Sequence, residues 1–147
     1  MKKVTNVNSL LVTIFNNVLK IETKALLEGP FDDLSITEVH TIDAIGLHDK
    51  KNMSEVAKKL DITLGTLTTA INNLVKKNYV KRSKDTIDKR VVFISLTSRG
   101  RLLYRVHENF HNNVVKTVLE GVSTEENEVL LSALRNLNSF LENEIAK

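Results

Sequence analysis

The sequence predicts a mainly α fold with one small β-hairpin, in a chain of 147 residues that forms one compact domain. Three observations support this prediction. Apolar residues recur at helical spacing over long stretches, three helix starts carry Ser or Asn followed three residues later by Glu, and one stretch is rich in alternating β-branched residues. One proline and five glycines leave room for long helices.

The first two helices are separated by a short loop. Apolar residues at helical spacing run from residue 7 to about residue 28, and Gly29-Pro30 ends this helix. Ser35 and Glu38 form a capping box, in which each side chain bonds to the backbone of the other residue, and they begin a second helix. That helix ends near Gly46.

Two more helices follow in close succession. Asn52 and Glu55 begin a third helix over residues 53–60, and Thr63 caps a fourth helix over residues 64–77. A short helix followed at once by a longer one is the pattern of a helix-turn-helix.

The fourth helix has one apolar and one polar face. Leu67, Ile71 and Leu74 lie at i, i+4 and i+7 and are predicted to be buried. Threonine is a mediocre helix former, so the polar face weakens the helix unless its groups have another use. Short hydrogen-bonding side chains suit a helix that enters the major groove of DNA, and a solvated helix face is the alternative. The candidate DNA-binding residues of this face are Thr66, Thr68, Thr69, Asn72 and Asn73.

A β-hairpin with a charged tip follows directly. Residues 79–84 and 90–96 are predicted to be strands, and residues 84–89 form a polar turn between them. Asp88 can pair with an arginine across the turn and fix its shape. Basic side chains on such a tip suit phosphates and a narrow minor groove, and the candidates are Lys81, Arg82, Lys84, Lys89 and Arg90.

Charge is unevenly distributed. Residues 50–105 carry 14 Lys and Arg against four acidic residues, whereas the whole chain has a net charge of +3, so the remainder carries −7. A basic block in an otherwise acidic chain indicates a polyanionic partner, and a solvated charged face is the alternative. The hairpin beside the polar helix favours double-stranded DNA.

Two long helices complete the chain. Thr97 caps a fifth helix that ends at Gly121, and Ser123 with Glu126 begins the last one. The first, fifth and last helices carry apolar stripes. The region between them, residues 35–97, is too small to cover all of these stripes. We therefore expect a homodimer in which a second copy covers them.

This organisation divides the chain into three functional parts. Residues 1–34 are expected to form an N-terminal dimerisation helix and loop, and residues 35–97 a winged helix-turn-helix DNA-binding domain. Residues 98–147 are expected to form C-terminal dimerisation helices.

Other classes of protein are disfavoured. The chain has no Cys, no Gly-rich phosphate loop and no Ser/His/Asp arrangement of recognisable spacing, so we expect neither an enzyme nor a disulfide framework. No apolar stretch is long enough to span a membrane. We expect a cytoplasmic protein without cofactor, resident metal or membrane partner.

Residues 54–100 resemble the winged helix-turn-helix core of the MarR family of transcriptional regulators. The matching features are Asp88-Lys89-Arg90, the strand end Ile94-Ser95-Leu96-Thr97, and Gly100 in the following helix. Asn78 departs from the glycine that the family usually has there, but Asn tolerates the left-handed backbone of a helix end. The resemblance implies that Arg90 contacts DNA, that Asp88 positions it, and that a dimer binds a palindromic operator.

More narrowly, IFNNVLKIE, EVHTIDAIG, TLGTLTTAINNL and RLLYRVHENFH resemble the FabT-type repressors of fatty-acid synthesis. This resemblance implies operators at genes of fatty-acid biosynthesis and a long-chain acyl group on acyl carrier protein as corepressor. Apolar residues of the first and fifth helices suit an acyl pocket, although they also suit an ordinary core. The candidate pocket residues are Leu11, Ile14, Phe15, Val18, His40, Leu103, Val106, His107 and Phe110.

His107 and His111 leave a second possibility for the signal. They lie at i and i+4 on one helix face, a spacing that suits zinc, and some regulators of this family sense zinc. The chain lacks an HExxH pattern and Cys, so structural or ligand-contacting histidines are the preferred interpretation. A small aromatic or lipophilic ligand is the remaining alternative.

Overall fold

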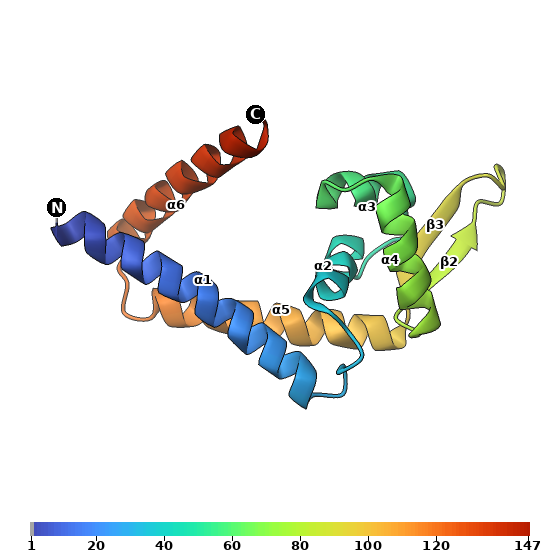
Figure 1. The fold of residues 1–147 in the computed structure, drawn as a ribbon, viewed down its shortest axis with the longest axis horizontal. Coiled ribbons are helices and arrows are strands. Elements are labelled where there is room, and N and C mark those ends of the chain that lie inside the picture. Colours follow the sequence, from blue (N-terminus) through green and yellow to red (C-terminus); the bar gives the residue numbers. More distant parts are fainter. Residues whose placement is uncertain (1) are drawn as a thin grey trace. The chain divides into compact units, whose positions relative to one another are not determined.

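The computed structural model describes residues 2–147, with side chains from Asn6 onward. Its elements, shown in Figure 1, are α1 Lys2–Glu28, α2 Ile36–Ile45, β1 Lys51–Asn52, α3 Met53–Leu60, α4 Leu64–Lys76, β2 Val80–Lys84, β3 Val92–Leu96, α5 Ser98–Leu119 and α6 Thr124–Ile145. The chain divides into two units, Met1–Val106 and His107–Lys147, and the boundary falls within α5. The predicted mainly α fold with a small sheet is confirmed.

The helix starts form as their capping residues predict. At α2, the Glu38 backbone N–H donates to Ser35 Oγ over 3.2 Å, and the Ser35 N–H donates to Glu38 Oε2 over 2.8 Å. The same reciprocal pairing begins α3 and α6. The Thr66 N–H donates to Thr63 Oγ1 over 3.1 Å at the start of α4. These bonds satisfy N–H groups that have no partner within a helix, which explains why the helices begin where they do.

The turn after α4 requires an unusual backbone conformation. Asn78 has φ 66°, in the left-handed region that most residues avoid. Asn adopts this region more readily than most non-glycine residues. The chain can therefore reverse from α4 into β2 without a glycine.

The sheet has three antiparallel strands in the order β1-β3-β2. Val80 pairs with Leu96 and Lys84 with Val92, so the predicted hairpin is confirmed. The predicted strand start at residue 90 is wrong, because the Val91 N–H donates to the Asp88 carbonyl oxygen and keeps the chain in a turn until β3 begins. The sequence pattern does not predict the two-residue strand β1.

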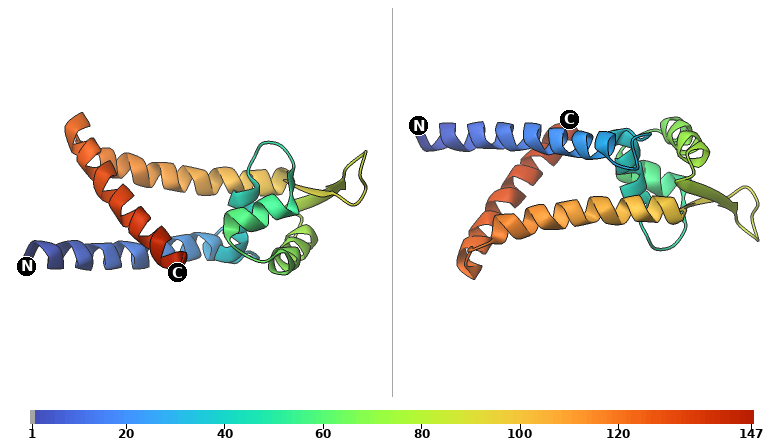
Figure 2. Two further views of the ribbon diagram at one scale, coloured as in Figure 1. Left: turned by 90° about the horizontal axis from the view of Figure 1, so that it is seen from above. Right: turned by 90° about the horizontal axis from the view of Figure 1, so that it is seen from below.

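The core of the first unit lies between α2, α3, α4 and the inner face of the sheet. The predicted stripe Leu67, Ile71 and Leu74 is fully buried, and Val56 and Ile94 pack in the same cluster. Figures 1 and 2 show the β2–β3 hairpin projecting away from these helices. The core thus holds α4 beside the root of the hairpin while the polar face of α4 stays in solvent.

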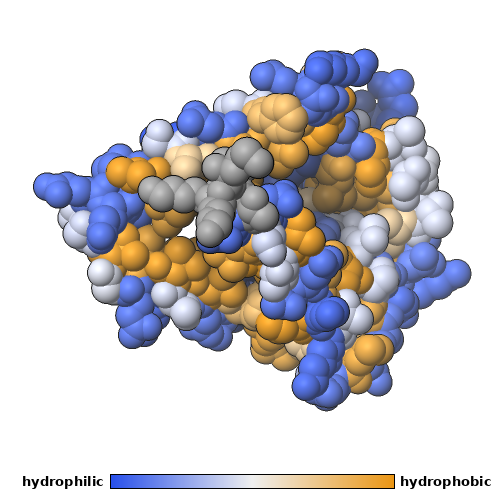
Figure 3. All heavy atoms as spheres, turned by 60° about the vertical axis from the view of Figure 1, so that its left-hand side comes forward, coloured by the Kyte–Doolittle hydropathy of each residue, from blue (hydrophilic) through white to orange (hydrophobic). Residues whose placement is uncertain are grey.

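The long helices leave many apolar side chains exposed. All residues of α6 are described, and none of them is buried. Hydrophobic side chains lie at the surface among hydrophilic ones, as Figure 3 shows for one face. The exposed large hydrophobic residues of α1, α5 and α6 include Leu10, Phe15, Val115, Leu134 and Phe140. Within the described part of the chain, no helix combines the length and the apolar character needed to cross a bilayer.

Candidate nucleic-acid interface

The polar face of α4 is exposed, as the sequence predicts. Thr66, Thr68, Thr69, Asn72 and Asn73 all lie in solvent. The Thr68 hydroxyl donates to the Leu64 carbonyl oxygen over 2.8 Å, and the Thr69 hydroxyl donates to the Gly65 carbonyl oxygen over 3.3 Å. Since these protons are used within the helix, the two side chains present acceptor lone pairs and methyl groups to a partner. Base-edge donors and the thymine methyl group are complementary to such groups.

The wing carries its basic side chains on the outside. Lys81, Arg82, Lys84, Lys89 and Arg90 are all exposed. None of these side chains is buried, so a polyanion can reach all of them.

The tip of the wing is shaped by Asp88. Its Oδ1 accepts from Arg90 Nε over 3.1 Å, and its Oδ2 accepts from Arg90 Nη2 over 3.2 Å. The Arg90 backbone N–H also donates to Asp88 Oδ1 over 3.1 Å. The Arg90 side chain, followed by its backbone N–H, lowers the pKa of the Asp88 carboxyl. The predicted pair is therefore present, and it fixes the direction in which the Arg90 side chain leaves the loop.

Arg82 joins the wing to α4. Its Nη2 donates a hydrogen bond to Asn72 Oδ1. A guanidinium group only donates, so the Asn72 carbonyl oxygen must face it and the Asn72 amide NH2 remains available to a partner. This bond joins the hairpin to the polar face of α4.

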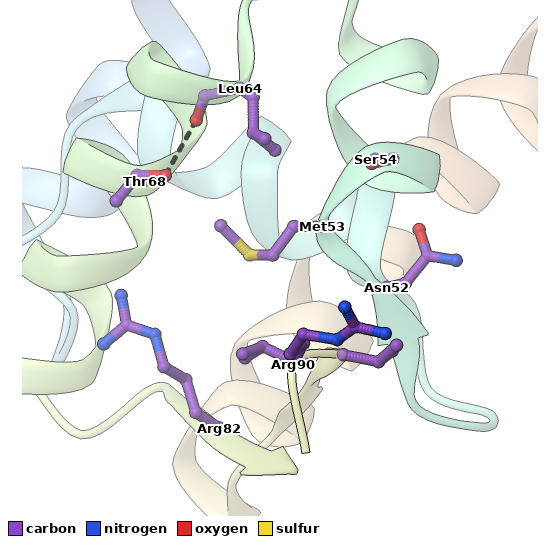
Figure 4. A pocket seen from close by; sticks show the side chains of 9 residues that line it. Asn52, Met53, Ser54, Leu64, Thr68, Arg82 and Arg90 are labelled. Carbon is purple, nitrogen blue, oxygen red and sulfur yellow. Dashed lines mark hydrogen bonds between the residues drawn. The ribbon is translucent and has the colours of Figure 1, made fainter. Parts of the chain in front are cut away.

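An open cavity of about 550 Å³ lies between the wing and the starts of α3 and α4. Figure 4 shows Arg82 and Arg90 on the hairpin side of this cavity, with Thr68 on α4 and Met53 on α3 opposite them. The structure therefore brings Thr68, Arg82 and Arg90 together. Thr66, Thr69, Asn73, Lys84 and Lys89 do not line the cavity.

Sequence reasoning missed the contribution of the α3 start to this cavity. Asn52, Met53 and Ser54 line it. The sequence predicts Asn52 only as the cap of α3, which the structure confirms. No sequence pattern points to this placement, because the α3 start reaches the wing through the pairing of β1 with β3 in space.

A polar network anchors the C-terminal end of α4. Lys77 Nζ lies 3.0 Å from both carboxylate oxygens of Glu38, which is buried at the start of α2. The Tyr79 hydroxyl donates to Asp33 Oδ1 over 2.6 Å, and the guanidinium carbon of Arg99 lies 4.5 Å from the centre of the Tyr79 ring. Burial and the hydrogen bond to Asp33 raise the pKa of Tyr79 well above its ordinary value. These contacts tie α4 to the α1–α2 loop and to the root of α5.

The candidate ligand residues occupy several elements. Leu11, Ile14, Phe15 and Val18 follow one face of α1, where Leu11 and Val18 are half-buried and the other two are exposed. Leu103 is buried in the core of the first unit. His40 and Val106 are exposed, and His107 and Phe110 are half-buried residues of the second unit.

The histidine pair of the second unit is close in space. His107 Nε2 and His111 Nε2 lie 3.1 Å apart, and their ring centres are 4.4 Å apart. The two ring nitrogen atoms are therefore within hydrogen-bonding distance of each other.

The fold and this surface define a winged helix-turn-helix protein. Residues 34–92 match the MarR family. The HTH-type transcriptional regulator PchR of Bacillus subtilis is 30% identical over 113 residues, which cover 75% of this chain and 67% of PchR. The crystal structure of Streptococcus pneumoniae FabT in complex with DNA is similar with a TM-score of 0.85 and 45% identity, covering 95% of this chain and 97% of FabT.

A more distant likeness is to S. aureus MepR, solved as a complex with DNA. It has 26% identity and a TM-score of 0.63, over 91% of this chain and 97% of MepR. Together these similarities identify the family. The chain belongs to the MarR family and is a DNA-binding transcriptional regulator, not an enzyme.

Proposed function

We propose that the protein is a repressor that binds a palindromic operator as a homodimer. The observation that carries this proposal is the exposed surface of α4 and the wing, joined by the hydrogen bond between Arg82 and Asn72. In the proposed complex α4 of each protomer enters the major groove and the wing lies at the adjacent minor groove. The proposed contacts are Thr66, Thr68, Thr69, Asn72, Asn73, Arg82, Lys84, Lys89 and Arg90, with Asp88 positioning Arg90.

The exposed helices support the dimer. Helix α6 buries none of its side chains within the chain, although Leu134 and Phe140 are large and apolar. Apolar stripes of this length expose a large area to water unless a partner covers them. A second copy presents matching stripes, so residues 1–34 and 98–147 are proposed to form the dimer interface around the DNA-binding residues 35–97.

Fatty-acid biosynthesis genes are the proposed targets, and long-chain acyl-acyl carrier protein is the proposed corepressor. The identity of 45% to FabT over 95% of the chain supports this assignment. The apolar face of α1, with Leu11 and Val18 half-buried and Phe15 exposed, offers part of the contact surface that an acyl chain needs.

The test measures operator affinity by fluorescence anisotropy with three additions: palmitoyl-acyl carrier protein, the same carrier without an acyl chain, and buffer. We expect the acylated carrier alone to tighten binding at least 10-fold, as a coupling of about 1.4 kcal/mol requires. Equal effects of both carriers, or weaker binding with the acylated one, contradict the proposed corepressor while leaving operator binding intact.

A zinc-sensing regulator is the second candidate. It is favoured by the distance of 3.1 Å between the Nε2 atoms of His107 and His111. Equilibrium dialysis with zinc distinguishes it: tight stoichiometric binding that His107→Ala abolishes supports zinc sensing. Native mass spectrometry of the protein purified from its host separates a bound acyl chain from a small aromatic or lipophilic ligand.

A further inference from the structure

Ile87 is the most exposed large hydrophobic side chain in the part of the chain whose side chains the structure describes, with 94% of its surface in solvent. The other strongly exposed apolar residues are mainly on α1, α5 and α6, where a second protomer is proposed to cover them. Ile87 instead lies at the tip of the wing, between β2 and β3. Dimerisation through the long helices therefore does not account for it.

The loop presents Ile87 from a fixed backbone. The Ile87 N–H is 3.4 Å from Asp85 Oδ1, and the Asp85 N–H donates to the Val91 carbonyl oxygen over 3.0 Å. On the other side, Asp88 accepts from both the backbone and the side chain of Arg90. A loop that is ordered before binding loses little conformational entropy when it meets a partner.

Turn chemistry does not require an isoleucine here. None of the described non-glycine residues with a positive φ lies in the wing. The backbone at residue 87 therefore does not require Gly or Asn, and many side chains can occupy this position. Polar residues are the usual choice at an exposed tip. An apolar, β-branched side chain in this place gains free energy only when a partner removes it from water.

The surrounding charge identifies the partner. Lys84, Lys89 and Arg90 flank the tip and are exposed, and they outnumber the acidic residues Asp85 and Asp88, so phosphates attract the loop toward DNA. The walls of the minor groove between the phosphates are deoxyribose C–H groups, which are apolar. Proteins that bind this groove commonly place apolar side chains such as Ile in it.

We propose that Ile87 is a minor-groove contact that packs against the deoxyribose walls of the operator between the phosphates held by the wing. The proposal rests on the operator binding proposed above and adds a contact that is apolar rather than ionic. Its affinity contribution is therefore independent of counterion release, unlike that of the neighbouring lysines.

The test uses the full-length protein and an operator duplex that the wild-type protein selects from a random-sequence library. Anisotropy titrations over a range of salt concentrations compare wild type with Ile87→Ser, Ile87→Leu and Lys89→Ala. Because the Ile87 side chain is almost fully exposed, we expect all variants to unfold at the wild-type temperature.

We expect Ile87→Ser to weaken operator binding about 10-fold, since each dimer loses two apolar contacts. The slope of log K against log salt should stay at the wild-type value. Ile87→Leu should bind within about twofold of wild type, and Lys89→Ala should reduce the slope by about 2 per dimer.

Wild-type affinity in Ile87→Ser, or equal losses in the Ser and Leu variants, overturns the inference while operator binding stands. The isoleucine then serves a protein or lipid contact. A reduced salt slope in Ile87→Ser also overturns it, because the loss would then be ionic. Failure of the wild-type protein to select any duplex overturns the proposed function itself, and this inference with it.

Discussion

Arg82 on β2 donates a hydrogen bond to Asn72 on α4, and this bond links the wing to the polar face of that helix. The two residues are ten positions apart in the sequence and both are exposed. The bond fixes the orientation of the Asn72 amide, so that its NH2 group faces outward as a donor. Acceptors on base edges, such as guanine O6 and N7 or thymine O4, match this donor.

Removing Arg82 should affect both affinity and sequence preference. Arg82→Met deletes a positive charge and releases the Asn72 amide, so we expect weaker operator binding by at least 10-fold and a salt slope lower by about 2 per dimer. Selection from a random duplex library should also return a relaxed base preference at one position per half-site. Arg82→Lys separates the effects, since it keeps the charge. A salt slope or a base preference identical to wild type in Arg82→Met contradicts the role assigned to this bond.

Asp88→Asn should reduce specific binding even though it makes the wing more positive. The carboxylate holds the Arg90 side chain through two bonds, and the amide cannot accept at both positions. We expect the ratio of operator to non-specific affinity to fall about 10-fold. Asp49→Asn makes the same change in charge at an exposed left-handed position that Asn tolerates, and it serves as the control. Equal ratios in the two variants contradict the positioning role of Asp88.

The pair should persist through the physiological pH range. The pKa of Asp88 is lowered from its ordinary 3.8, so the carboxylate stays charged at every pH above that value. The contribution of the pair is present above the unfolded pKa and is lost only as pH falls through the lower folded pKa. We expect the NMR chemical shift of the Asp88 carboxyl carbon to stay constant between pH 8 and pH 5. A titration of that chemical shift centred above pH 5 contradicts the assignment.

Gly100 should be intolerant of any side chain. A Cβ atom at this position would lie 2.1 Å from the Tyr79 carbonyl oxygen, where the chain turns from α4 into the wing and meets α5. We expect Gly100→Ala to lower the free energy of unfolding by about 2 kcal/mol or more, measured in urea. Gly65→Ala is the control, because nothing lies within 4 Å of its Cβ position, and it should raise stability by about 0.5–1 kcal/mol. Equal stabilities of the two variants contradict this close packing.

The dimer should depend on the apolar stripe of α6. Leu134→Asp places a charge on an exposed apolar residue that the proposed interface buries, so sedimentation should show a monomer and operator binding should be lost. Ser132→Asp, on the opposite side of the same helix, should remain a dimer. A dimeric Leu134→Asp variant places the interface elsewhere.

Much of the fold could be predicted because its signals are local. The pairing of Ser35 with Glu38 and the spacing of Leu67, Ile71 and Leu74 lie within one or two helical turns, and the structure confirms both. Strand β1 could not be predicted, because two residues carry no periodicity and their pairing depends on where β3 lies in space. The Arg82–Asn72 bond escaped for the same reason, since it depends on how the wing folds back toward α4.

The most direct test of the central claim is the salt dependence of operator binding by the wild-type protein and by Arg90→Ala. We predict that the dimer binds a palindromic duplex more tightly than a scrambled one, with affinity falling steeply as salt increases. Arg90→Ala should weaken binding to both duplexes and lower the slope by about 2 per dimer, while the variant remains folded and dimeric. Binding that ignores salt, or an Arg90→Ala variant with wild-type affinity, would contradict the assignment of α4 and the wing as the DNA-binding surface.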